Sequence, residues 1–130
     1  MYNILIAEGS GALRNLLSSV LSAVGYDVIV ACDGMEALDV ADHRSGPIHL
    51  LCVNFSVPRF HGVALAERLK AQHPEMKVLL LITDDPRFLS IDDVGAAERH
   101  PDYAVMRKPF SVGDLTAKIE EVLATSAAAL

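Results

Sequence analysis

Residues 4–17 have the sequence ILIAEGSGALRNLL, in which an apolar run leads directly into a helical pattern. The continuous run at 4–7 predicts a strand that is covered on both faces, as in a parallel sheet. From Leu13 onward, leucines and valines recur every three or four residues, which predicts a helix that ends at Gly25. The stretch is therefore expected to form a strand, a glycine-containing loop and a helix.

The same unit recurs along the chain. Continuous apolar runs at 3–7, 27–32, 49–54, 77–83 and 103–106 alternate with helical patterns at 13–24, 35–43, 63–72, 86–100 and 112–124. The last helix opens with Ser111 and Asp114, a variant of the capping box. The pattern at 86–100 has the weakest apolar face, so we expect it to be the most mobile helix. The alternation predicts one doubly wound α/β domain with a five-stranded parallel sheet and right-handed crossovers.

Composition excludes several classes of function. The chain has 130 residues, 52% of them hydrophobic, and a formal net charge of -6. These values suit one domain and disfavour direct binding to nucleic acid. No apolar run reaches the ~18 residues of a membrane span, and the start lacks the basic region of a signal peptide.

Cys32 and Cys52 lie in apolar runs, so we expect buried, reduced thiols and a cytoplasmic location. The expected domain covers 1–126, and 127–130 are expected to be a frayed tail or linker stub.

The loop at Gly9, Ser10 and Gly11 offers an alternative function, because a glycine loop between a strand and a helix can cradle a phosphate. The dinucleotide fingerprint GxGxxG is incomplete here, since Arg14 occupies the third glycine position. Glu8 also places a negative charge beside the loop. An anion- or nucleotide-binding module at residues 9–11 is kept as an alternative.

The carboxyl ends of parallel strands are where such sheets bind their ligands. In this chain the ends of the predicted strands carry Glu8 and Gly9, then Asn54 and Ser56, then Thr83, and lastly Lys108 and Pro109. The chain resembles the receiver domain of two-component response regulators, the CheY-like family, in five segments: ILIAEGSGALRNLL, GYDVIVACDGMEAL, HLLCVNFSVPRFHG, VLLLIT and VMRKPFSVGDL. The resemblance covers essentially the whole chain. It implies a flavodoxin-like fold with strand order 2-1-3-4-5.

The resemblance also implies a phosphorylation pocket. In such receivers, carboxylates of the first loop hold Mg²⁺, and an aspartate at the end of the third strand accepts a phosphoryl group. A hydroxyl and a lysine contact the transferred oxygens. Thr83 and Lys108 match these last two positions, and Pro109 is expected to use the cis form that such receivers show.

The acidic half of the pocket departs from the family. Asn54 stands at the phosphoacceptor position, and its amide is a poor nucleophile without negative charge. Glu8 and Gly9 stand where paired acids are usual, so Glu8 is the only remaining candidate metal ligand. We therefore expect no metal site and Mg²⁺ binding that is weak or absent. Lys108 is expected to make a static polar contact with Glu8 or with the Asn54 carbonyl.

Three further positions bear on switching and phosphorylation. Val105 occupies the place of the switch aromatic residue, three positions before Lys108, and Tyr103 is expected to point to the same face by strand parity. Ser56 is an alternative phosphoacceptor, although the sequence shows no base to activate its hydroxyl.

These observations predict an atypical receiver, or pseudo-receiver. It is expected not to be an enzyme and to act in two-component (phosphorelay) signalling through protein contacts. The resemblance implies a sensor histidine kinase or an output domain as partner and a homodimer through residues 86–124. The acidic net charge and the lack of a long apolar run predict no direct contact with nucleic acid or membrane. The alternatives are a receiver phosphorylated at Ser56 and an anion- or nucleotide-binding loop at residues 9–11.

Overall fold

The computed structural model describes residues 2–57, 62–82 and 91–124, and it confirms the predicted fold. The strands are β1 (Asn3–Ala7), β2 (Asp27–Ala31), β3 (Leu50–Asn54), β4 (Lys77–Ile82) and β5 (Tyr103–Arg107). The helices are α1 (Gly11–Val24), α2 (Gly34–His43), α3 (Gly62–Gln72), α4 (Ile91–Arg99) and α5 (Val112–Ala124). The strands form one parallel sheet in the order β2-β1-β3-β4-β5.

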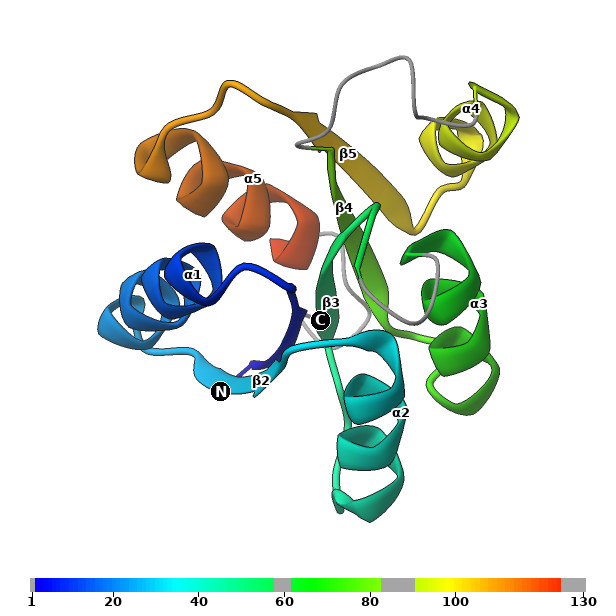
Figure 1. The fold of residues 1–130 in the computed structure, drawn as a ribbon, viewed down its shortest axis with the longest axis horizontal. Helices are drawn as coiled ribbons and strands as arrows, with labels where there is room; N and C mark the ends of the chain where they lie inside the picture. Colours follow the sequence, from blue (N-terminus) through cyan, green and yellow to red (C-terminus); the bar gives the residue numbers. More distant parts are fainter. Residues whose placement is uncertain (1, 58–61, 83–90, 125–130) are drawn as a thin grey trace.

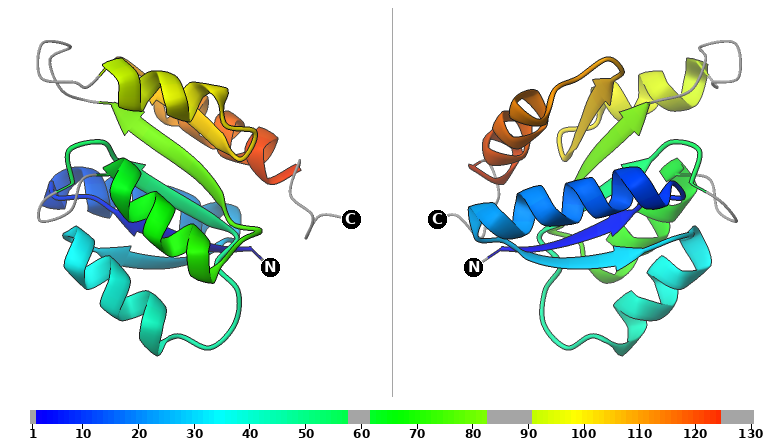
Figure 2. Two further views of the ribbon diagram at one scale, coloured as in Figure 1. Left: turned by 90° about the vertical axis from the view of Figure 1, so that its right-hand side faces the viewer. Right: turned by 60° about the vertical axis from the view of Figure 1, so that its left-hand side comes forward.

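Helices cover both faces of the sheet. Figure 1 shows α1 and α5 on one side and α2, α3 and α4 on the other, and Figure 2 shows the same layers from two further directions. Leu17, Leu21 and Ile119 belong to the apolar cluster beneath α1 and α5, and Leu65 and Leu69 belong to the cluster on the opposite face. Every residue of β3 is buried, which explains why its sequence is continuously apolar rather than alternating.

Local capping residues set the helix ends. The Ser10 hydroxyl accepts a hydrogen bond from the Leu13 backbone N–H at 3.3 Å, and Gly25 ends α1 at a φ of 111°. This positive φ favours glycine because other residues pay a steric cost there. The predicted capping box of α5 is confirmed, since Ser111 and Asp114 exchange side-chain to backbone hydrogen bonds at 3.0 and 3.1 Å.

The expectation of two buried thiols was right for Cys52 and wrong for Cys32. Cys52 is buried in β3, and burial raises the pKa of its thiol to about 12. Cys32 is exposed, because β2 ends one residue earlier and the chain leaves the sheet there. On α1, Leu16 and Val24 are 47% and 48% exposed, because the helix packs on the sheet along the narrower stripe that holds Leu17 and Leu21.

Some expectations lie outside the described residues. These are the tail at 127–130 and the part of the helical pattern at 86–90. Among the described helices, none has the length and apolar composition needed to span a membrane.

Stability is expected to fall between about pH 7 and 5 because of His49. Its Nδ1 accepts the Asn3 backbone N–H at 2.9 Å, which requires an unprotonated nitrogen, and burial lowers the pKa of His49. The unfolded chain therefore binds the proton first, so this stabilisation is present above about pH 6.5 and is lost as the pH falls below it. Urea midpoints at pH 7.5 and 5.5 should show a smaller decrease for His49→Gln than for wild type. Equal decreases would contradict this assignment.

Candidate functional site

Glu8 and Asn54 form the centre of the candidate site. Glu8 follows β1 and Asn54 ends the neighbouring parallel strand β3, so both lie at the carboxyl edge of the sheet. They are the two buried polar residues among those that the structure describes, at 5% and 6% exposure. The Asn54 Nδ2 donates a hydrogen bond of 2.8 Å to Glu8 Oε1. The amide thus faces the carboxylate directly.

The other oxygens of this pair are also engaged. The Ser10 backbone N–H donates to Glu8 Oε2 at 2.8 Å, and the Ser56 backbone N–H donates to Asn54 Oδ1 at 3.0 Å. These contacts determine the orientation of the amide, because a reversed amide would direct its NH₂ group at the Ser56 N–H and its oxygen at the carboxylate. Both oxygens of the buried carboxylate therefore accept hydrogen bonds from the protein itself.

Two residues support the site in ways that the sequence analysis missed. Arg14, considered only as an obstacle to a nucleotide fingerprint, donates from Nη1 to the Glu8 carbonyl at 2.9 Å. Gly62 lies so close behind Asn54 that a Cβ atom there would be 2.6 Å from the Asn54 carbonyl oxygen. The signal for Gly62 was present in the quoted segment NFSVPRFHG, where it follows Asn54 by eight positions.

Lys108 lies beside the site but does not make the expected contact. It lines an open pocket of about 480 Å³ together with Glu8, Ser10, Leu13, Pro109 and Phe110. The Lys108–Pro109 peptide bond is cis, as expected. Lys108 is exposed and makes no ion pair or side-chain hydrogen bond within the described part of the chain. The predicted contact with Glu8 or Asn54 was wrong, because the Ser10 N–H and the Asn54 amide already donate to the carboxylate and the exposed ammonium of Lys108 faces solvent at no desolvation cost.

Comparison with known proteins identifies the family to which the chain belongs. The family described as "Response regulator receiver domain" matches residues 4–120. The chain belongs to the response regulator receiver family.

Relatives within this family differ in length. The alkaline phosphatase synthesis transcriptional regulatory protein PhoP of Bacillus subtilis is 30% identical, over 95% of this chain and 49% of PhoP. The response regulator receiver protein CpdR of Brucella abortus is 28% identical, over 95% of this chain and 98% of CpdR. A receiver domain structure from Clostridium thermocellum aligns with a TM-score of 0.81 at 20% identity, over 95% and 94% of the two chains. The chain spans about half the length of curated relatives such as PhoP.

The metal site that the receiver family implies does not fit the residues present. Mg²⁺ needs oxygen ligands in near-octahedral geometry, usually from carboxylates. Of the two loop positions that usually carry acids, Glu8 supplies the only carboxylate and Gly9 has no side chain. Asn54 directs the N–H hydrogens of its amide at the Glu8 carboxylate. In the described residues, no cluster of three or more His, Cys, Asp or Glu side chains is placed to hold a metal ion.

For the remaining predicted receiver positions, the structure gives the location of Val105, Tyr103 and Ser56. Thr83 lies outside the described residues. Val105 and Tyr103 are half-buried and pack against the same apolar cluster, so they share a face of β5 as expected from strand parity. Burial raises the pKa of Tyr103, and its ring lies 4.5 Å from the His100 ring. Ser56 is exposed. Their roles in switching or phosphorylation stay predictions.

Proposed function

We propose that this receiver domain acts in two-component signalling as a pseudo-receiver that is not phosphorylated at position 54 and is not an enzyme. The hydrogen bond between Asn54 and Glu8 carries this proposal. An amide nitrogen is a weak nucleophile, and it carries no charge with which to recruit a cation. The hydrogen bond also occupies the carboxylate that would otherwise bind Mg²⁺.

Signalling in this proposal depends on protein contacts in the cytoplasm. The partner is a sensor histidine kinase or an output domain. The segment 86–124, of which the structure describes residues 91–124, is the proposed site of contact and of homodimer formation. A partner can shift such a domain only through a difference in affinity for two of its conformations. The net charge of -6 gives no support for direct binding to nucleic acid.

Intact mass measurement tests the absence of phosphorylation. Wild type and Asn54→Asp are incubated with acetyl phosphate and Mg²⁺, and we expect wild type to gain no phosphoryl group. A gain by Asn54→Asp would show that Lys108 and the rest of the pocket still support the reaction. If wild type gains a phosphoryl group, the pseudo-receiver proposal is wrong. A Ser56→Ala variant and peptide mapping would then test Ser56 as the acceptor.

A further inference from the structure

A pocket of about 360 Å³ lies between α3 and α4, on the face of the sheet opposite α1 and α5. Its apolar lining includes Val63 and Ala97, which are 8% and 2% exposed, and it continues over Ala96 and the rings of His100 and Tyr103. Small-molecule sites in proteins have this size and this mixture of apolar walls with a few polar groups. The pocket shares no lining residue with the pocket of the candidate site.

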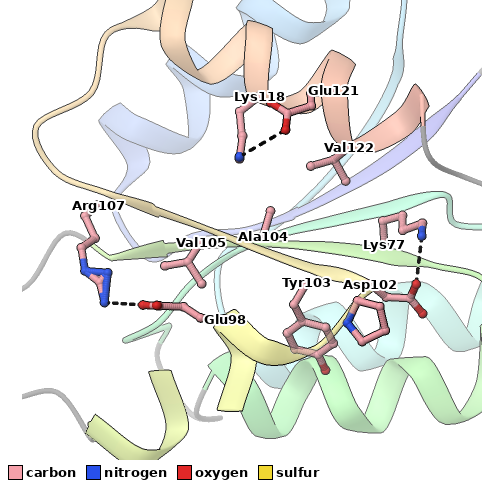
Figure 3. A pocket seen from close by; sticks show the side chains of 11 residues that line it. Lys77, Glu98, Asp102, Tyr103, Ala104, Val105, Arg107, Lys118, Glu121 and Val122 are labelled. Carbon is pink, nitrogen blue, oxygen red and sulfur yellow. Dashed lines mark hydrogen bonds and ion pairs between the residues drawn. The ribbon is translucent and has the colours of Figure 1, made fainter. Parts of the chain in front are cut away.

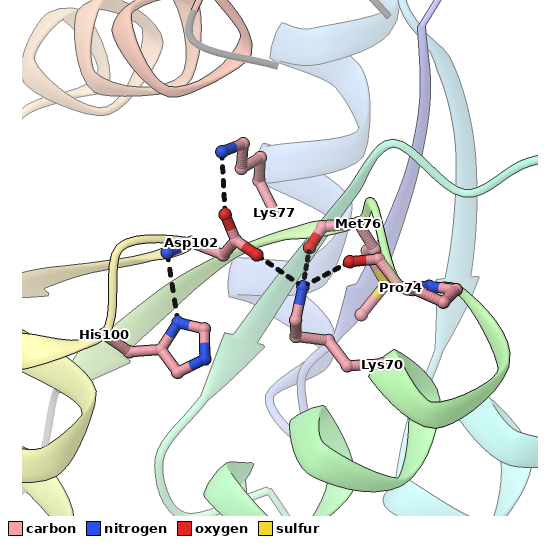
Figure 4. A network of polar contacts seen from close by, with 6 residues as sticks. All are labelled: Lys70, Pro74, Met76, Lys77, His100 and Asp102. Atoms are coloured by element: carbon pink, nitrogen blue, oxygen red, sulfur yellow. Dashed lines mark hydrogen bonds and ion pairs between the residues drawn. The ribbon is translucent and has the colours of Figure 1, made fainter. Parts of the chain in front are cut away.

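Lys70 also lines this pocket, but its ammonium is fully engaged within the protein. Figure 4 shows it donating to the Pro74 carbonyl at 2.9 Å, the Met76 carbonyl at 2.8 Å and Asp102 Oδ2 at 2.9 Å. An ammonium has three N–H donors, and these three acceptors use all of them. Lys70 therefore has no hydrogen bond to offer a ligand.

Three other side chains of the lining keep hydrogen-bonding capacity. The Tyr103 hydroxyl and the Glu67 carboxylate make no hydrogen bond or ion pair within the described residues. Figure 3 shows Tyr103 directed from β5 toward α3, and burial, followed by the charge of Glu67, raises its pKa, so the hydroxyl keeps its proton at neutral pH. The His100 Nδ1 accepts the Asp102 N–H at 3.1 Å, which leaves Nε2 of the neutral ring as a donor.

The charges around the pocket balance. Lys70 and Lys77 share the carboxylate of Asp102, each at 2.9 Å, and Glu67 supplies a second negative charge. A cationic ligand would meet the excess positive charge of the two lysines, and an anionic ligand would meet Glu67. This balance favours a neutral ligand over either charged form.

The shape and composition of the walls favour an aromatic ligand. The His100 and Tyr103 rings lie 4.5 Å apart with an interplanar angle of 43°. Aromatic side chains attract a further ring by stacking or by edge-to-face contact. On the α4 side, the lining consists of the small side chains of Ala96 and Ala97.

We infer that the pocket between α3 and α4 binds a neutral, planar aromatic molecule that carries a carboxamide or a similar donor–acceptor group. The apolar walls bury its ring. The Tyr103 hydroxyl and the His100 Nε2–H are the donors for its carbonyl, and the Glu67 carboxylate is the acceptor for its N–H. The inference goes beyond the proposed function, because binding here needs neither a phosphoryl group nor a protein partner.

Three probes with the same ring system test the ligand class. Near neutral pH, indole-3-acetamide is uncharged, tryptamine carries an ammonium and indole-3-acetate carries a carboxylate. Each probe is added to ¹⁵N-labelled protein, and amide shifts are followed by NMR. We expect saturable shifts centred on α3 and α4 with indole-3-acetamide, and about tenfold weaker affinity for each charged probe. The absence of saturable shifts with indole-3-acetamide, shifts centred elsewhere, or a charged probe that binds as tightly would overturn the inference.

Filling the pocket tests its location. Ala96→Leu enlarges an exposed side chain of the lining, and we expect it to weaken the binding of indole-3-acetamide about tenfold. Ala23→Leu is the matched control, because it makes the same change at an exposed position of α1 on the other face of the sheet. Its affinity should equal that of wild type. Equal affinities of the two variants would contradict binding between α3 and α4.

Tyr103→Phe tests the polar contact, because it removes the hydroxyl and keeps the ring. Loss of one hydrogen bond should weaken the binding of indole-3-acetamide about fivefold. The unfolding temperature without probe should stay close to that of wild type, since the hydroxyl makes no hydrogen bond within the described residues. An affinity equal to that of wild type would show that the ligand does not contact this hydroxyl and would overturn the inferred mode of binding.

Discussion

Asn54→Asp is expected to unfold at a lower temperature than wild type in EDTA and to recover much of the loss in Mg²⁺. The substitution replaces a 2.8 Å amide-to-carboxylate hydrogen bond with two buried carboxylates at that distance. The loss of the donor and the repulsion together should cost about 3 kcal/mol, or about 10 °C in a domain of this size. Mg²⁺ can bind both carboxylates and offset the repulsion. Thermal unfolding by circular dichroism measures both effects.

A double variant provides the matched control. In Glu8→Gln/Asn54→Asp, the amide and the carboxylate exchange positions, so a donor again faces an acceptor. The Ser10 and Ser56 N–H groups still find oxygen acceptors in this arrangement. We expect stability in EDTA close to wild type and no response to Mg²⁺, which a double-mutant cycle would report as favourable coupling. If Asn54→Asp in EDTA unfolds at the same temperature as wild type, the buried hydrogen bond contributes little to stability.

Gly62→Ala is expected to destabilise the domain by about 2–3 kcal/mol, because the new methyl group meets backbone rather than a flexible side chain. The Cβ would lie 2.6 Å from the Asn54 carbonyl oxygen and 3.0 Å from the Phe55 Cα. The Asn54 carbonyl also accepts the Val57 N–H at 3.1 Å, so moving it would disturb the turn that carries the site. Urea denaturation measures the change in the free energy of unfolding.

Gly113→Ala is the matched control on α5. Its added methyl group would meet nothing nearer than the Ser111 Oγ at 3.7 Å, so helix propensity should make it neutral or stabilising by up to about 1 kcal/mol. Equal losses in the free energy of unfolding for the two variants would indicate a general cost of replacing glycine at the start of a helix. A loss confined to Gly62→Ala would support close packing behind Asn54.

Much of the fold could be predicted from local patterns. The continuous apolar runs identify the strands, and Gly25, Ser111 and Asp114 identify helix ends, because these signals depend on residues within one turn of each other. Burial was predicted less well. Cys32 has apolar residues before it in the sequence, but its exposure depends on where the sheet edge ends, which no local pattern encodes.

The sequence by itself determined the alternation of strands and helices, the asparagine at position 54 and the glycine at position 9. The tertiary structure alone decided that the Asn54 amide faces Glu8, a residue 46 positions away, and that Lys108 makes no hydrogen bond or ion pair with either of them within the described residues. Secondary structure follows from short-range periodicity and capping, whereas these contacts depend on how distant strands pack and on which of several competing donors comes nearest to a buried carboxylate.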